Sequence, residues 1–230
     1  MASITENIAS VRERIARAAE RAGREPSDIT TVAVAKGVDV ERMREAIDGG
    51  ISIIGENRVQ EALHKVKTLG RSVMWHMVGH LQRNKAKEAV RIFNLIQSLD
   101  SLRLAEEINS RALAAGTIMD VLVQVNTSGE ETKFGLEPEE ALDFLGSIST
   151  CKGLSVRGLM TIGAFLPDPE EVRPCFRTLR ELKEKIIDAR LPNVEMEYLS
   201  MGMTSDFEVA IEEGANMVRI GTAIFGPRAY

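Results

Sequence analysis

Short apolar, β-branched runs alternate with amphipathic helical patterns along almost the whole of this 230-residue chain. Near-continuous apolar runs joined by helices are typical of parallel strands that are buried on both faces. The runs predict eight strands, at residues 30–36, 52–57, 73–79, 93–100, 120–126, 155–163, 195–200 and 217–226. Helical patterns separate them, for example at residues 40–50, 101–116 and 170–190.

An extra helix precedes the first predicted strand. Ser3 and Glu6 form an S-x-x-E capping box, an apolar stripe follows at helical spacing, and Gly23 is placed to end the helix. Eight strand–helix units are what a (β/α)8 barrel requires. An open doubly wound sheet is the competing architecture, but no G-x-G-x-x-G follows the first strand. We therefore expect an α/β protein, a (β/α)8 TIM barrel forming a single domain over residues 1–230, with no C-terminal β domain.

Composition limits the classes of partner. A net charge of -5 and an aromatic content of 4% argue against a nucleic-acid binder, which needs a basic face and stacking side chains. No apolar run approaches the roughly 20 residues of a membrane span, and the N-terminus lacks the apolar centre of a signal peptide. Cys151 and Cys175 lie in no metal-ligand spacing, which favours a reducing cytoplasm. His76 and His80 stand where a strand turns towards a helix, so we expect no metal site there.

Polar residues gather where the predicted strands end. In a barrel, the carboxyl ends of all strands meet at one rim, and that rim carries the chemistry. The polar residues at these ends are Lys36, Glu56, Asn57, His80, Ser98, Asn126, Thr127, Thr161, Ser200 and the 219–222 stretch. We expect them to converge on one site.

Lys36 ends a strand that otherwise reads TVAVA. An amine that points into an apolar barrel mouth is desolvated, which lowers its pKa and leaves a free amine able to form Schiff bases with aldehydes and ketones. A lysine just past the end of a strand can equally extend its amine into water. The position alone gives the two interpretations equal weight.

The segments LSMGMTS and VRIGTAIF form a second group of polar residues. Ser200 and Thr222 offer hydroxyls, and Gly202 and Gly221 allow backbone amides to approach an anion closely. The loops after strands seven and eight are the standard phosphate site of barrels. Their placement therefore favours phosphate binding over ordinary turn and helix-cap chemistry.

Two further predictions concern the same segments. Thr204 or Ser205 is expected to cap the helix that follows, with Glu208 completing a capping box to Ser205. Arg219 lies on the last strand, and a buried arginine inside a barrel is costly unless it is paired. Its guanidinium either pairs with a carboxylate or points at a ring nitrogen of a bound cofactor.

Six segments together resemble a known family. They are AVAK ending at residue 36, GENRVQE (55–61), WHMVGHLQRNKAK (75–87), VNTSGEETKFG (125–135), RGLMTIG (157–163) and LSMGMTSDFEVAIEEGANMVRIGTAIFG (199–226). Over essentially its whole length, the chain resembles the YggS/PROSC family of pyridoxal 5'-phosphate (PLP) homeostasis proteins. The last segment is long and highly specific. The family is similar to the N-terminal barrel of alanine racemase, the fold-type III architecture of PLP proteins.

The resemblance implies a cofactor site in which Lys36 holds PLP as an internal aldimine and Arg219 faces the pyridine nitrogen. An arginine there cannot accept a proton, so the ring stays unprotonated and is a weak electron sink. That property suits carrying PLP better than driving carbanion chemistry. The other implied residues are two that line the pocket, Asn57 and His80, and four that hold the phosphate, Ser200, Gly202, Gly221 and Thr222.

Two positions beside the implied pocket depart from the family pattern. Lys36 is followed by Gly37 and Val38, where the family usually has a small or polar residue and then a proline. Arg58 stands where the family often has an aromatic residue. Both departures bear on the affinity for the cofactor and on the orientation of its ring.

Three functions are compatible with a lysine beside a phosphate loop. The first, which the resemblance favours, is a PLP carrier that buffers the cofactor and delivers it to apo-enzymes without turnover; we expect this carrier to be cytoplasmic and monomeric. The second is a fold-type III racemase or decarboxylase, but racemisation needs a second acid–base group opposite the lysine. Tyr198 lies within a predicted strand and Tyr230 is terminal, so neither suits that role. The third is a Schiff-base aldolase acting on a sugar phosphate.

Overall fold

The computed structural model describes residues 3–227, in which eight parallel strands close into a barrel. The strands are β1 (Thr30–Val34), β2 (Ile53–Glu56), β3 (Met74–Met77), β4 (Leu95–Leu99), β5 (Met119–Gln124), β6 (Leu154–Met160), β7 (Val194–Ser200) and β8 (Met217–Ile220). β1 pairs with both β2 and β8, so the sheet has no free edge. The predicted (β/α)8 barrel is confirmed.

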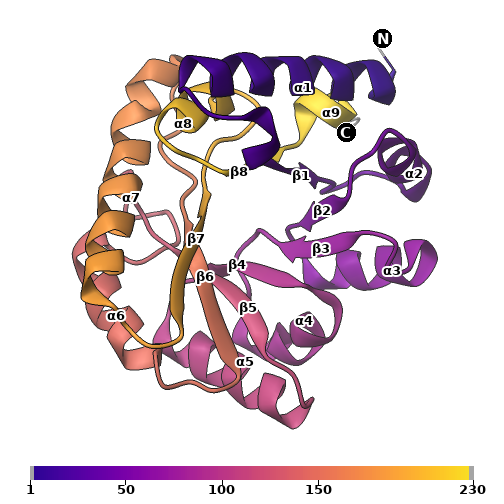
Figure 1. Cartoon of the computed structure of the whole chain (residues 1–230). Helices are drawn as coiled ribbons and strands as arrows, with labels where there is room; N and C mark the ends of the chain where they lie inside the picture. Colours follow the sequence, from indigo (N-terminus) through magenta and orange to yellow (C-terminus); the bar gives the residue numbers. More distant parts are fainter. Residues whose placement is uncertain (1–2, 228–230) are drawn as a thin grey trace.

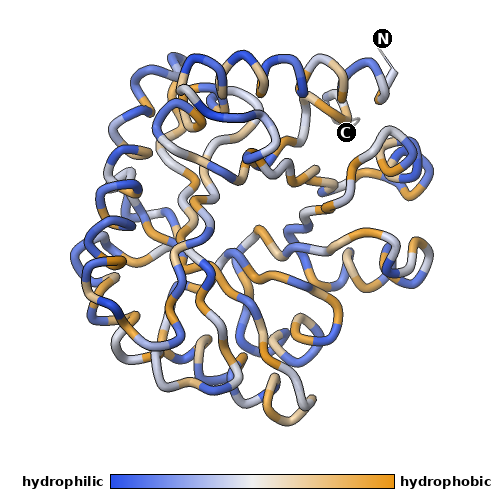
Figure 2. The backbone as a smooth tube through the Cα atoms, in the orientation of Figure 1, coloured by the Kyte–Doolittle hydropathy of each residue, from blue (hydrophilic) through white to orange (hydrophobic). Residues whose placement is uncertain are grey.

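Helices alternate with the strands and form a ring outside the barrel (Figure 1). They are α1 (Ile4–Arg21), α2 (Val40–Asp48), α3 (Val59–Leu69), α4 (Ala86–Ile92), α5 (Leu102–Ala114), α6 (Ala141–Ile148), α7 (Pro169–Ala189), α8 (Phe207–Glu212) and α9 (Thr222–Phe225). Along the helices, apolar and polar positions alternate as the backbone turns (Figure 2). This amphipathic pattern is what helices that cover a buried sheet require.

The helix α1 is the predicted extra helix. The capping box between Ser3 and Glu6 is present. Gly23 follows the C-cap residue with a φ of 66°, the left-handed conformation that glycine commonly adopts just past the end of a helix. The helix lies alongside α8 and α9 (Figure 1). The Asn7 side-chain amide donates to the Ile224 carbonyl at 2.9 Å. The first helix of the barrel is thereby fastened to the last one.

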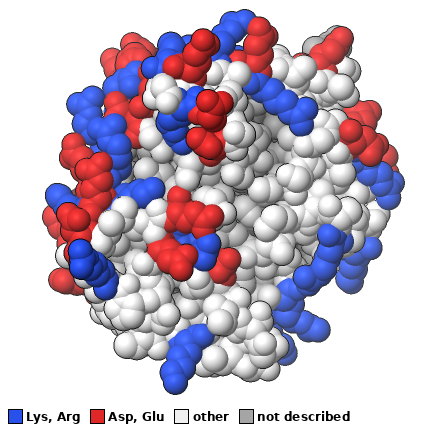
Figure 3. Space-filling model, viewed as in Figure 1, with Lys and Arg blue, Asp and Glu red and all other residues white. Residues whose placement is uncertain are grey.

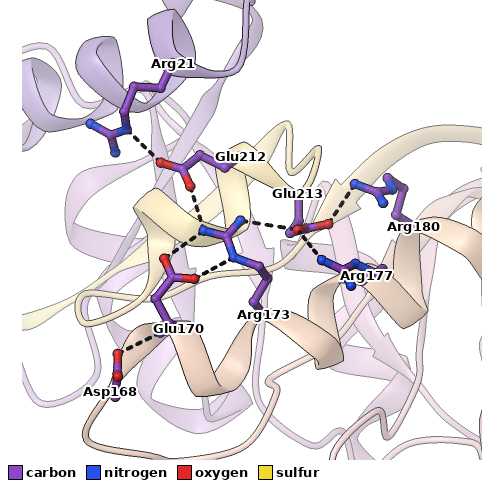
Figure 4. Close-up of polar contacts among 8 residues, drawn as sticks. All are labelled: Arg21, Asp168, Glu170, Arg173, Arg177, Arg180, Glu212 and Glu213. Carbon is purple, nitrogen blue, oxygen red and sulfur yellow. Dashed lines mark hydrogen bonds and ion pairs between the residues drawn. The ribbon is translucent and has the colours of Figure 1, made fainter.

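A charged cluster joins α7 to α8 and α1 (Figure 4). Arg173 pairs with Glu170 on its own helix and with Glu212 and Glu213 at the end of α8, while Arg21 of α1 also pairs with Glu212. Hydrogen bonds from the guanidinium to Glu170 and Glu212 hold the pKa of Arg173 above its usual range. On the face drawn in Figure 3, charges of both signs are mixed over α1 and α7. Single exposed ion pairs contribute little, but this network connects three helices.

The chain after β8 differs from the prediction. The sequence predicts one strand over residues 217–226, whereas β8 ends at Ile220 and Thr222–Phe225 form α9. Gly221 lies between them with φ -110° and ψ -84°, where the chain turns. The run TAIF is apolar and only 4 residues long, too short to display a helical period. Its sequence therefore reads as a continuation of the strand.

β6 carries an irregularity at Gly158. The pairing register shifts next to this residue on both sides, with β5 and with β7. Gly158 has a φ of 148°, and a Cβ built on it would lie 2.0 Å from the Tyr198 carbonyl oxygen of β7. The close approach of the two backbones requires glycine at this position.

Three findings bear on the expected class of protein. No helix within residues 3–227 is long and apolar enough to cross a membrane. In the same part of the chain, no three metal-ligating side chains are grouped as a metal site requires. Cys151 and Cys175 are both free thiols.

Candidate functional site

Lys36 lies just beyond β1, at the mouth formed by the carboxyl ends of the strands. Its half-buried side chain borders two adjoining cavities. One, here called the Arg219 cavity, has a volume of about 440 Å³, and the other, the His80 cavity, about 640 Å³. Asn57 also borders both. The two cavities therefore meet at an amine and an amide.

The structure brings most of the predicted site residues together. The Arg219 cavity is lined by five of them: Lys36, Asn57, Arg219, Gly221 and Thr222. His80 lines the neighbouring cavity. Ser200 and Gly202 line neither of the two.

Arg219 extends from β8 into the barrel and is only 4% exposed. Its guanidinium donates at 2.7 Å to the Ser200 hydroxyl and at 2.7 Å to the Thr161 carbonyl. It forms no ion pair with any residue between 3 and 227, so of the two alternatives for Arg219, pairing with a carboxylate is not observed. Burial lowers the pKa of Arg219 to about 10, against the attraction of the Asp206 carboxylate. The guanidinium is therefore protonated at neutral pH and acts as a donor only.

A chain of hydrogen bonds runs from Arg219 through the barrel interior. The Ser200 hydroxyl donates to Gln97 Oε1 at 2.6 Å, and Gln97 Nε2 lies 3.0 Å from His76 Nδ1. An amide nitrogen is a donor only, so His76 Nδ1 must accept and the ring must be neutral. Burial lowers the pKa of His76 to about 4, in agreement with a neutral ring. The Ser200 hydroxyl is thus committed to orienting Arg219.

Thr204 offers a hydroxyl at the cavity wall, a role that the sequence predicts for Ser200. Its Oγ1 accepts from the backbone N–H of Gly221 at 3.3 Å and of Ala223 at 3.4 Å. These bonds are long, so the donors and the hydroxyl are available to a stronger acceptor. In the sequence, Thr204 is a hydroxyl residue in the loop after strand seven, and a helix cap is the simpler explanation for such a residue.

That predicted helix cap is wrong. The N-cap residue of α8 is Asp206, which makes no side-chain capping hydrogen bond. The Asp206 carboxylate accepts instead from the Met203 backbone N–H at 2.6 Å, closing the preceding turn. The helix therefore begins after Asp206, and both Thr204 and the more exposed Ser205 border the Arg219 cavity.

The two glycines of the predicted phosphate loop have different roles. Gly202 has a φ of 90°, and a Cβ there would lie 2.6 Å from Ala210 Cβ and 2.8 Å from Phe207 Cα. It is therefore glycine because α8 packs directly against it. Gly221 borders the cavity itself, and the nearest atom to a Cβ there would be the Val34 carbonyl oxygen at 3.5 Å.

His80 is held on two sides in the second cavity. Its ring stacks on Phe134, with centroids 3.8 Å apart, and its Nδ1 lies 3.1 Å from Asp100 Oδ2. Burial raises the pKa of Asp100, and the nearby His80 opposes that rise. Arg58 and Lys85 add two cationic side chains to the lining. Phe134 lies in an irregular loop after β5, where no periodicity marks its contact with His80.

A buried ion cluster lies beneath the turn after β1. Lys65 of α3 donates at 2.7 Å each to the Ala35 carbonyl, to Glu56 Oε1 and to Glu61 Oε1. Glu61 Oε1 also accepts from the Gly37 backbone N–H at 2.7 Å. Nothing in the sequence marks Lys65 as part of the site, because an isolated lysine in a polar helical stretch has the appearance of a solvated residue.

Two buried groups impose opposite dependences of stability on pH. Burial raises the pKa of Glu56 to about 7, against the attraction of Lys65, whereas burial lowers the pKa of His76 to about 4. Their unfolded values are about 4.3 and 6.5. The stability that Glu56 contributes to the folded state is fully present below about pH 4.3 and is lost as the pH rises through 7. The stability that His76 contributes is fully present above about pH 6.5 and is lost as the pH falls through 4.

The two pH dependences, each spanning roughly 3 kcal/mol, should largely cancel, so the free energy of unfolding of the native protein should change little between pH 4.5 and 6.5. We expect Glu56→Gln to remove the part of the pH dependence in which stability falls as the pH rises. The free energy of unfolding of this variant, minus that of the native protein, should then increase from pH 5 to pH 7. Urea unfolding at pH 5, 6, 7 and 8 measures this difference. A difference that does not change with pH would contradict the raised pKa of Glu56.

Comparisons with known proteins agree with this geometry. The family model for the alanine racemase N-terminal domain matches residues 6–229. The pyridoxal phosphate homeostasis protein of Aquifex aeolicus is 46% identical over 226 residues, which cover 98% of each chain. That of Escherichia coli is 38% identical over 234 residues, covering 100% of this chain and 99% of the relative. The chain belongs to the pyridoxal phosphate homeostasis protein family.

Solved structures support the same assignment. PipY of Synechococcus elongatus with PLP bound has a TM-score of 0.85 and 33% identity, covering 97% of this chain and 100% of that one. An alanine racemase of Clostridium difficile shares the fold, with a TM-score of 0.77 and 17% identity, over 99% of this chain and 57% of that one.

In this member of the family, the two departures from the family pattern both lie at the site. Gly37 occupies the turn after Lys36 with a φ of 70°, a conformation that favours glycine. Arg58 is the exposed N-cap residue of α3 and borders the His80 cavity. The first departure shapes the turn that bears the lysine, and the second adds a cation to the cavity wall.

Proposed function

We propose that the protein binds PLP as a Schiff base on Lys36 and takes part in PLP homeostasis, buffering and delivering the cofactor without turnover. One observation carries the proposal: the Lys36 amine and the buried Arg219 guanidinium border the same cavity. PLP, which PipY binds, supplies an aldehyde that condenses with an amine and a pyridine ring that draws electrons.

The residues of the Arg219 cavity fit this cofactor. Arg219 would face the ring nitrogen as a donor, and so keep that nitrogen unprotonated. Asn57 Oδ1 is buried without a partner among residues 3–227, which leaves an acceptor for a donor on a ligand. Thr204, Gly221 and Thr222 would hold the phosphate. Ser200 would act one step removed, by orienting Arg219.

Carrying is better supported than racemisation. A racemase needs an acid–base group opposite the lysine. Tyr198 packs against the inner apolar cluster of the barrel and borders neither cavity, and Tyr230 lies outside the described residues. An unprotonated pyridine ring would also stabilise a carbanion poorly. We place the protein in the cytoplasm as a monomer, a setting that suits its two free thiols and the delivery of PLP to apo-enzymes.

The near-ultraviolet and visible spectrum before and after borohydride tests the binding of PLP. We expect a yellow protein that bleaches on reduction, with the cofactor covalently attached to the peptide that contains Lys36. A colourless protein that takes up no added PLP would overturn the proposal. A phosphosugar trapped at Lys36 in place of PLP would favour the aldolase.

A transfer assay tests delivery. PLP should leave the protein faster in the presence of an apo-enzyme than by spontaneous release. Equal rates would refute delivery and leave storage alone.

A further inference from the structure

We propose that Glu61 and Lys65 are positioning residues that hold the turn bearing Lys36, and thereby fix where its amine stands in the Arg219 cavity. The inference rests on the proposed function, which makes the position of that amine important. It assigns to α3 a role beyond covering the barrel.

The lysine sits in a tight turn. The Val38 backbone N–H donates to the Ala35 carbonyl at 3.0 Å, so Lys36 and Gly37 are the central residues of a β-turn. Gly37, the third residue, has a φ of 70°, as a type II turn requires. A Cβ at Gly37 would meet no atom within 4 Å, so conformation rather than space calls for glycine. A turn of this kind is closed by a single main-chain hydrogen bond.

Side chains of α3 hold the peptide groups on both sides of this lysine. Lys65 binds the carbonyl of the preceding residue, Ala35, and Glu61 binds the N–H of the following residue, Gly37, both at 2.7 Å. Lys65 and Glu61 also bind each other at 2.7 Å, which joins the two contacts. With Glu56 as the third acceptor, all three donors of the ammonium are used.

The burial of this cluster makes the contacts difficult to replace. The side chain of Lys65 is 6% exposed and that of Glu56 is 0% exposed, so water cannot readily substitute for their hydrogen bonds. Movement of the turn would leave a buried ammonium partly unpaired, which is costly. The turn and α3 are therefore expected to move as one body. Because α3 also carries part of the His80 cavity wall, the amine keeps its place relative to that wall.

Glu61 permits a test that separates position from charge. Glu61→Gln removes the charge but keeps an oxygen that accepts from Gly37, whereas Glu61→Ala removes both. Glu107→Ala on α5 is the matched control. Glu107 pairs with Arg111 at 2.7 Å with the same i,i+4 spacing as Glu61 and Lys65, and its side chain is 27% exposed against 26% for Glu61.

Two quantities should be measured on each variant: hydrogen exchange at the Gly37 amide without ligand, and the dissociation constant for PLP from absorbance titration. We expect Glu61→Ala to accelerate exchange at least about tenfold and to weaken PLP binding about tenfold, since small misplacements of a reacting group are costly. Glu61→Gln should stay within about threefold of the native protein in both quantities, and Glu107→Ala should change neither.

A single substitution at Lys65 could prevent folding by leaving a buried charge unpaired, so a double variant is used as well. Lys65→Met combined with Glu56→Gln leaves the buried pair neutral, and it should fold and still bind PLP about tenfold more weakly. Faster exchange at Gly37 with unchanged PLP affinity would overturn the proposal, as would exchange that Glu61→Ala does not alter. If the native protein takes up no PLP, the proposed function fails, and the exchange measurements still decide whether Glu61 holds the turn.

Discussion

Replacing Lys36 with alanine should abolish covalent retention of PLP. Lys36 is the lysine that borders both cavities, and alanine offers no nucleophile for a Schiff base. After borohydride reduction, the mass of the native chain should increase by one PLP adduct and that of Lys36→Ala should not. The fold should survive, because the half-buried amine makes no hydrogen bond with residues 3–227.

The control for this substitution is Lys85→Ala. Lys85 borders only the His80 cavity and is also half-buried, so its removal should leave the adduct in place. An adduct of equal yield on Lys36→Ala would show that another amine holds the cofactor. The assignment of the Arg219 cavity as the cofactor site would then fail.

Substituting Gly158 with alanine should cost more than about 4 kcal/mol of folding free energy, because it forces a backbone clash at a strained position. The added Cβ would lie 2.0 Å from the Tyr198 carbonyl oxygen and 2.8 Å from its carbonyl carbon. Neither atom belongs to a flexible side chain, so β6 and β7 would have to separate. We expect little folded protein, measured by circular dichroism and urea unfolding.

Gly146→Ala provides the opposite expectation. Gly146 lies inside α6, and a Cβ there would meet nothing within 4 Å. Alanine should therefore stabilise the protein by up to about 1 kcal/mol, since it favours the helix over the unfolded chain. If both substitutions had the same effect, the strain at Gly158 would be refuted.

The barrel could be predicted from the sequence because the patterns that indicate it lie within short, continuous segments of the chain. Each buried strand and each amphipathic helix is visible as a run of residues, and the carboxyl ends of parallel strands must share one rim. Lys36 and Arg219 could be assigned to that rim on this basis. The run TAIF could not be resolved, because one helical turn has no period to read.

The finer contacts of the site are not local, and the sequence does not show them. Ser200 has a suitable hydroxyl in a suitable loop, but its partner Gln97 is 103 residues away. That contact is the reason that Ser200 orients Arg219, while Thr204 is one of the hydroxyl residues that line the cavity. The role of Lys65 is also not visible in the sequence, because the contact that accompanies its burial is with a turn 30 residues earlier in the chain.

The pairing of β1 with β8 has a consequence for synthesis of the protein on the ribosome. On the side away from β2, residues 30–33 pair only with residues 217–220, so that edge of the first strand stays open until residue 220 has been translated. A nascent sheet with two exposed edges is prone to pair with other chains, and distant contacts of this kind form slowly. We expect chains arrested before Met217 to aggregate or to bind chaperones, and the barrel to close only after the other strands have been synthesised.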